Sequence, residues 1–201
     1  MATEIISNAG LPSVELLLPA TWNRLDLAPA TRLTSIARLV ERTTKAGPEF
    51  AEARTTMRAE FERAAEIGAA SGASLAFVYW SAPEGKLASA SLFVALVDAT
   101  GRLEGHPAPG PRALADALAA RYGGEVGELE AGPAARVRRR GRVPAENGSG
   151  TGPEAEIVTW YVPHESGRRL AVLTFSTPNV GLAEEFGEVF DTVADTLRWT
   201  A

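Results

Sequence analysis

The sequence contains no cysteine, only two histidines and only two lysines, and each shortage limits what the protein can be. Without cysteine there are no disulfides, no thiolate nucleophile and no thiolate-ligated zinc or iron–sulfur cluster. No apolar run approaches the about 20 residues that span a bilayer. The first residues also lack the basic and apolar regions of a signal peptide. We therefore expect a soluble cytoplasmic protein with no membrane contact.

The remaining composition is that of a globular protein. The chain has 201 residues, of which 45 % are hydrophobic and 22 % charged, so we expect one domain over residues 1–201. Its net charge of −5 argues against general nucleic-acid binding. Arginine far outnumbers lysine, and alanine, glycine and proline are abundant, which is typical of a GC-rich bacterial genome.

Four segments carry apolar residues at helical spacing, and the last is the clearest. Its stripe faces a core and consists of Leu182, Phe186, Val189, Phe190, Val193 and Leu197. We expect this helix to close the domain, with Phe190, Leu197 and Trp199 in the core. The four predicted helices are Thr31–Lys45, Pro48–Ala70, Arg112–Tyr122 and Leu182–Arg198.

Strand patterns occupy most of the rest of the chain, with Arg24–Leu27 as a further extended stretch. Their short connections require antiparallel pairing. We therefore predict an α+β fold, an antiparallel sheet of about six strands flanked by helices and ended by the C-terminal helix. The Gly/Ser/Asn-rich segment 144–155 predicts a flexible loop. The predicted strands are Ser13–Leu18, Leu75–Ser81, Ala88–Asp98, Glu125–Leu129, Ala134–Val143, Glu156–Pro163 and Arg169–Ser176.

Catalytic patterns are missing from the sequence. The two histidines, His106 and His164, lie in predicted loops and match no metal-binding motif. No serine elbow and no phosphate-binding loop occur. We expect no enzymatic activity, no metal and no cofactor.

The densest charge run is the segment Arg136–Arg142. On a strand, alternate side chains share a face, so Arg136, Arg138, Arg140 and Arg142 would form a basic stripe. Such a stripe could bind an acidic segment, a phosphate or a nucleic acid. The other interpretation is an exposed edge strand that its charges protect from aggregation.

Aromatic residues occur on both faces of two predicted strands. Trp80 follows Tyr79, and Trp160 lies between Thr159 and Tyr161. If helices cover one sheet face, the other face keeps a large aromatic residue. A second layer of the same domain or a groove for an apolar peptide would explain this.

The two ends of the chain resemble Mog1/PsbP-like domains, and more narrowly actinobacterial proteins of that type. The resemblance rests on Pro19-Ala-Thr-Trp22 after an early strand, and on Leu173-Thr-Phe-Ser-Thr-Pro178 before the last helix. In that helix, Phe190, Val193, Thr196 and Leu197 occupy the positions of the family signature F-x-x-I-x-x-T-F/L. The middle of the chain, residues 47–132, matches only in the order of its elements.

The resemblance implies an antiparallel sheet flanked by helices and a binding role. Known members are mostly non-enzymatic and include photosystem assembly subunits, a Ran-binding import factor and chaperones of secreted bacterial effectors. The matching positions are core and turn positions, so no functional residue is carried over. The family's lipoproteins use a cysteine, which this chain lacks.

Together these observations predict a non-enzymatic protein-binding module. A chaperone, adaptor or immunity-type protein linked to a bacterial secretion or toxin system would fit. The candidate contact residues are Arg136, Arg138, Arg140, Arg142, Trp80 and Trp160. The alternative is an anion- or small-molecule-binding domain that uses the basic stripe. Nothing in the sequence fixes the oligomeric state.

Overall fold

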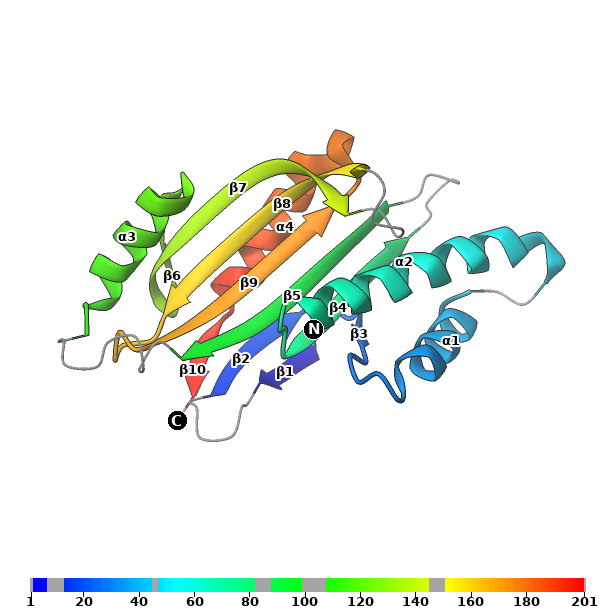
Figure 1. Ribbon diagram of the computed structural model, residues 1–201, viewed down its shortest axis with the longest axis horizontal. Coiled ribbons are helices and arrows are strands. Elements are labelled where there is room, and N and C mark those ends of the chain that lie inside the picture. The colour runs from blue at the N-terminus through cyan, green and yellow to red at the C-terminus, as the bar shows by residue number, and fades with distance from the viewer. Residues whose placement is uncertain are drawn as a thin grey trace.

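The computed structural model describes residues 2–6, 13–44, 47–81, 88–98, 108–144 and 151–200, which form two β-sheets and four α-helices (Figure 1). The large sheet has seven strands in the order β3-β4-β5-β9-β8-β7-β6. The small sheet has the order β1-β2-β10. All paired strands for which a register is defined run antiparallel. The predicted α+β class is confirmed.

Six of the seven strands in the large sheet coincide with predicted segments, and the seventh is the edge strand β3. The large sheet contains β3 (Trp22–Leu25), β4 (Leu75–Ser81), β5 (Ala88–Asp98), β6 (Glu125–Leu129), β7 (Gly132–Pro144), β8 (Thr151–Pro163) and β9 (Arg169–Thr177). The small sheet contains β1 (Ala2–Ile6), β2 (Ser13–Leu18) and β10 (Arg198–Thr200).

The β7–β8 pair is longer than predicted. Arg142 pairs with Glu154 and Gly141 with Ala155, so the strands continue past the turn-forming glycines. The prediction of a flexible loop over 144–155 is therefore wrong for residues 144 and 151–155. Its remaining part, residues 145–150, lies outside the described residues.

The helices begin and end close to their predicted bounds. Pro111 occupies the first turn of its helix, where its missing N–H is not needed. Gly123 ends the same helix in the left-handed conformation, with φ of 72°. The helices are α1 (Arg32–Thr43), α2 (Ala51–Ala70), α3 (Pro111–Tyr122) and α4 (Ala183–Asp195), with short 3₁₀ turns η1 (Pro48–Phe50) and η4 (Val180–Leu182).

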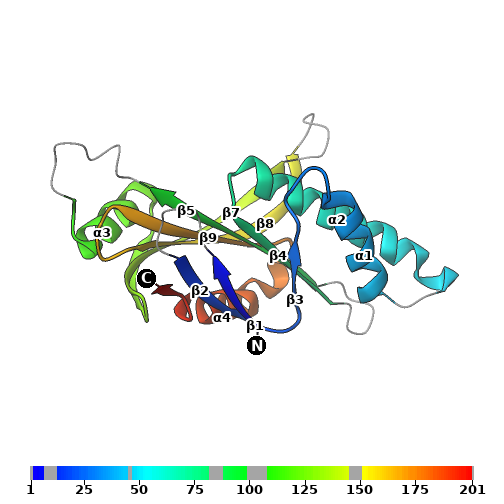
Figure 2. The same ribbon diagram turned by 90° about the horizontal axis from the view of Figure 1, so that it is seen from below.

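The elements form three layers, with the large sheet in the middle (Figure 2). On one face lie α4 and the small sheet, below the large sheet in Figure 2. On the other face, α1 and α2 lie at one end and α3 lies at the opposite end (Figures 1 and 2). This unequal coverage determines where a ligand can approach the sheet.

The main core fills the space between the large sheet, α4 and the small sheet. Phe175 of β9 stacks on Phe190 of α4, with ring centroids 4.8 Å apart. Trp22 meets the same phenylalanine edge to face at 6.5 Å. Leu16 of β2 is fully buried against this cluster. A second core joins α1 and α2 to β4 through Phe61, whose ring contacts that of Trp80 at 6.2 Å.

The C-terminal helix differs from its prediction in extent and in the face it buries. Phe186, Phe190 and Val193 are buried as expected, but Leu182 and Val189 are 41 % and 39 % exposed. The small residues Ala183, Gly187 and Ala194 of the same helix are buried instead. The helix also ends at Asp195, and the chain continues into β10. Leu197 is fully buried, whereas Trp199 is only partly buried at the edge of the core.

Candidate functional site

The most distinctive surface of the protein is the uncovered middle of the large sheet, on the face that carries α2 and α3. Alternation places Phe93, Ala95 and Val97 of β5 on this face. Their partners on β9 are Thr174, Val172 and Leu170. Helix α2 covers β4 and Phe93 of β5, and α3 covers β6, β7 and part of β8, so β9 and the remaining parts of β5 and β8 lie between the two helices (Figure 1). We call this band the open face.

The strand register aligns side chains in rows across the open face. One row crosses four strands in the order Arg139, Ile157, Ser176 and Ser91. It therefore begins with a guanidinium on β7, continues with an aliphatic side chain and ends with two hydroxyls. The next row toward α3 contains Thr159, Thr174 and Phe93.

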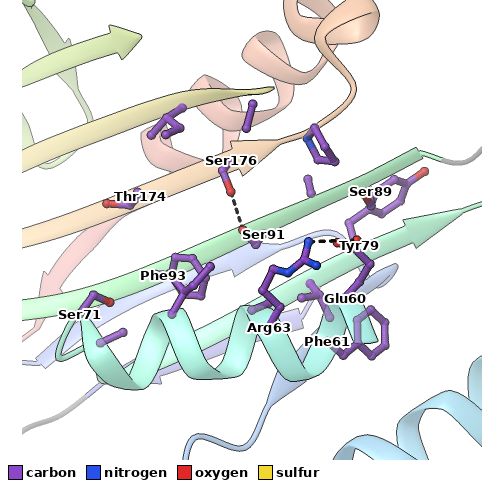
Figure 3. A pocket seen from close by; sticks show the side chains of 18 of the residues that line it. Glu60, Phe61, Arg63, Ser71, Tyr79, Ser89, Ser91, Phe93, Thr174 and Ser176 are labelled. Atoms are coloured by element: carbon purple, nitrogen blue, oxygen red, sulfur yellow. Dashed lines mark hydrogen bonds and ion pairs between the residues drawn. The ribbon is translucent and has the colours of Figure 1, made fainter. Parts of the chain in front are cut away.

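Helix α2 turns one end of the open face into a groove. The groove has a volume of about 400 Å³, within the range of about 300–1,000 Å³ of small-ligand sites. Phe61, Arg63 and Ile67 of α2 form its wall, and the rows of β5, β9 and β8 form its floor. In Figure 3 the side chain of Arg63 reaches from α2 toward the floor, and Phe93 lies between the helix and the sheet.

Two serine hydroxyls meet on this floor. The Oγ atoms of Ser91 and Ser176 are 2.7 Å apart across β5 and β9 (Figure 3). In this pair one hydroxyl donates to the other, so one proton remains for a further acceptor. No acceptor for it occurs among the described residues. The floor therefore presents a hydrogen-bond donor to the groove.

The groove is basic although the protein as a whole is acidic. Arg63, Arg139 and Arg142 line it, and Glu60 is the only carboxylate among its described lining residues. Glu60 Oε1 lies 3.6 Å from Arg63 Nη1. The lining thus has an excess of positive charge, against a net charge of −5 for the whole chain.

The open face is aromatic at its α3 end. Tyr161 of β8 stacks on Tyr122 of α3, with centroids 5.2 Å apart and ring planes 10° apart. Partial burial and the neighbouring tyrosine raise the pKa of Tyr161, while the positive charge of Arg139 acts against this shift. Val97 of β5 is exposed on the same band.

The predicted basic stripe lies largely on the opposite face, under α4. Arg136 donates Nε and Nη2 to the two carboxylate oxygens of Asp191, each at 2.9 Å. Its guanidinium also lies 5.9 Å from the centre of the Trp160 ring. These contacts attach β7 to α4.

Two further arginines of the stripe converge on one buried carboxylate. Arg138 Nε donates to Glu156 at 2.5 Å and Arg140 Nε at 3.1 Å, and the Glu156 side chain is only 3 % exposed. Arg138 also donates both terminal nitrogens to Glu184 of α4. These hydrogen bonds and the charge of Arg138 lower the pKa of Glu184. A role of these arginines in partner binding stays a prediction. Their ion pairs within the chain already account for charged side chains at these positions.

The fourth arginine of the stripe has a different environment. Arg142 lines the groove together with Arg139, which was not part of the predicted stripe. A register irregularity between Arg142 and Pro144 lies at this end of β7. The structure therefore divides the predicted stripe between the two faces of the sheet.

The two predicted tryptophans also lie on different faces. Trp160 is 5 % exposed in the main core, where its indole N–H donates to Asp191 at 3.1 Å. It belongs to a second layer of the domain, and a partner could not contact it without displacing α4. Trp80 packs edge to face on Phe61 and lines the groove.

No metal centre or membrane span is found within the described ranges. No group of three or more histidine, aspartate or glutamate side chains there is placed to hold a metal ion. No helix in that part of the chain is long and apolar enough to cross a bilayer. His164 contacts Trp199 and Ser166, and His106 lies outside the described residues.

No protein-family model matches the chain, and no curated protein matches it. Among solved structures it is similar to LpqN, involved in cell envelope biogenesis of Mycobacterium tuberculosis, with 10 % identity and a TM-score of 0.44 over 100 % of this chain and 91 % of that chain. It is also similar to a protein from Bacteroides thetaiotaomicron, with 13 % identity and a TM-score of 0.41. That match covers 94 % of this chain and 45 % of the other, so this chain spans less than half of it. A function can therefore be inferred only from the geometry of the chain itself.

Sequence reasoning missed the main residues of the groove, Arg139, Ser91 and Ser176. For the two serines, a signal is present in the alternation of β5, β8 and β9, whose groove-facing positions include small and hydroxyl side chains. Recognising it requires the register of three strands that are distant in sequence.

Proposed function

We propose that this protein is a non-enzymatic binding module that holds an extended segment of a partner protein in the groove beside α2. The single observation that carries the proposal is the open face, a band of apolar and hydroxyl side chains between the described helices α2 and α3. Burying apolar surface stabilises a complex by about 25 cal/mol per Å². A partner segment that covers this band would gain that contribution.

The composition of the floor favours binding over chemistry. The floor consists of hydroxyl and apolar side chains, and the charged lining residues are three arginines, which stay protonated at neutral pH, and Glu60, which lies beside Arg63. Hydroxyl donors and arginines recognise carbonyl and carboxylate groups, both of which a polypeptide offers. An adaptor or chaperone role follows from such a site.

The Mog1/PsbP-like assignment and a cytoplasmic place of action are parts of the same proposal. Both rest on sequence, namely the Phe190–Leu197 signature and the missing cysteine. They predict that the protein acts on partners that it meets before export.

Photo-crosslinking from the floor tests the proposal. A benzophenone amino acid at Thr174, in the middle of the open face, should attach in cells to one continuous segment of a partner protein. The purified partner should then bind wild-type protein, and Thr174→Trp, which fills the floor, should weaken that binding at least tenfold. Ala59→Trp, on the exposed side of α2, should leave the affinity unchanged. Equal affinity of the two tryptophan variants would contradict the proposal.

A further inference from the structure

We propose that the segment held in the groove is acidic, with one carboxylate at Arg139 and a main-chain carbonyl on the Ser91–Ser176 pair. This inference rests on the proposed function and names the chemistry of the partner. It combines three independent features: the charge of the groove, the free proton of the hydroxyl pair and the spacing of the row that joins them.

Charge complementarity selects an acidic partner. Arg139 is exposed, and none of its described neighbours forms an ion pair with it. Arg142 lines the same end of the groove. Guanidinium groups bind carboxylates through pairs of parallel hydrogen bonds, so Arg139 offers an anion-binding position on the open face. A basic segment would be repelled from the groove.

The hydroxyl pair selects a polypeptide over an acyl chain. If a hydrocarbon chain covered Ser91 and Ser176, the remaining proton of the pair would be buried without an acceptor. A buried donor left unsatisfied is unfavourable. A peptide carbonyl above the same serines accepts this proton. A fatty acid meets the charge requirement of the groove but not the hydrogen-bonding requirement of its floor.

The distance between the two positions fits an extended chain. Arg139 and Ser176 are separated by two strand spacings in their row, about 9–10 Å at 4.7–4.9 Å per spacing. An extended polypeptide advances about 3.3–3.6 Å per residue. The carbonyl bound by the serines therefore lies about three residues from the acidic side chain. The partner segment crosses the strands, with small or aliphatic side chains facing Ile157 and Val172.

Fluorescence anisotropy with defined peptides tests this inference. The probe is a fluorescein-labelled hexapeptide of alanine and valine with one central glutamate, compared with otherwise identical peptides carrying glutamine or lysine. Wild-type protein should bind the glutamate peptide at least tenfold more tightly than the glutamine peptide. Raising the salt concentration should reduce this preference, because screening weakens exposed charge pairs. The lysine peptide should bind least.

Matched variants locate the contacts. Arg139→Gln should remove the preference for glutamate. Arg58→Gln, on the outer side of α2, removes the same charge and should keep the preference. The double variant Ser91→Ala plus Ser176→Ala should weaken the glutamate and glutamine peptides by the same factor. A thermal melt of each variant establishes that it is folded.

The possible outcomes distinguish a failure of the acidic-segment proposal from a failure of the groove as the binding site. If the glutamine peptide binds as tightly as the glutamate peptide, and Thr174→Trp abolishes both, the acidic partner is refuted and the groove remains the binding site. If dodecanoate competes more strongly than the glutamate peptide, the ligand is an acyl chain and the inference is wrong. Absence of binding by every peptide also refutes it. If Thr174→Trp leaves peptide binding intact, the groove itself is refuted.

Discussion

At the scale of single residues, Phe190 joins more of the fold than any other aromatic side chain in the described core. Its ring contacts Phe175, Phe186 and Trp22, so it links α4 to the large sheet and to the start of β3. Its neighbour Val189 is exposed on the other side of the same helix. The two positions differ in burial but share the backbone conformation of α4.

We expect Phe190→Ala to lower the free energy of unfolding by about 3–5 kcal/mol, because the cavity left behind adds to the lost burial. Val189→Ala should change it by less than about 0.5 kcal/mol. Urea unfolding followed by tryptophan fluorescence measures both. Similar losses at the two positions would show that α4 packs through a different face.

The ion pair between Glu184 and Arg138 is expected to make stability depend on pH. The pKa of Glu184 is lowered in the folded protein, so its contribution is present above the ordinary value of 4.5 and is lost as the pH falls through the folded pKa. The difference in unfolding free energy between wild type and Glu184→Gln should therefore shrink below about pH 4.5.

Urea unfolding between pH 7 and pH 3 measures this difference. Glu185→Gln, in the same turn of α4, controls for the loss of an acidic residue near a helix N-terminus. A wild-type advantage over Glu184→Gln that stays constant down to pH 3 would refute the ion pair.

At the scale of elements, the turn between β8 and β9 depends on a glycine for two reasons. Gly167 has φ of 63°, and a Cβ atom there would collide with the carbonyl oxygen of Pro109. Gly72, which follows α2, has φ of 72° but open space around its Cα. Both turns require the left-handed conformation, whereas only the first also requires the missing side chain.

Gly72→Ala should therefore cost about 1–2 kcal/mol, the strain of a left-handed alanine. Gly167→Ala should cost more, because the segment before α3 must also move away from the turn. Thermal unfolding by circular dichroism compares the two variants. Equal shifts in melting temperature would mean that the contact with Pro109 is absent in solution.

Regular elements were predictable from the sequence because periodicity depends only on neighbours along the chain. The strands β4 and β5 match their predicted bounds, since each is bordered by turn residues. β1 and β10 were not predicted. β10 has only three residues and follows Leu197, which continues the helical spacing of α4. Without its partner strand β2, the β10 segment therefore looks like a continuation of the helix.

The site was less predictable because it depends on which side of a strand each helix covers. Alternation correctly places Arg136, Arg138 and Arg140 on one face of β7. It does not indicate that α4 brings Asp191 and Glu184 to that face. Arg139, on the other face, had no distinguishing feature in the sequence. Its importance follows only from the row that it shares with residues of β8 and β9.

At the scale of the whole molecule, the small sheet joins the two ends of the described chain. β10 pairs with β2 through Arg198–Glu15 and Trp199–Val14. Just before β10, Thr196 Oγ1 accepts a hydrogen bond from the Leu17 N–H at 3.0 Å.

Deletion of residues 196–201 should therefore destabilise the protein more than Leu197→Ala alone, for which about 2–5 kcal/mol is expected. The difference between the two variants reports on strand pairing and on the Thr196 hydrogen bond. Equilibrium urea unfolding at one protein concentration compares them. Equal losses would show that β10 contributes nothing beyond the burial of Leu197.

The pairing of β2 with β10 also sets the order of events during synthesis. β2 leaves the ribosome well before α4 and β10. Until they follow, Leu16 and Leu18, both buried in the folded protein, lack the helix and the strand that cover them. The complete small sheet can therefore form only after β10 has been made, and contacts between such distant segments slow folding. The nascent chain is expected to need protection from aggregation until that point.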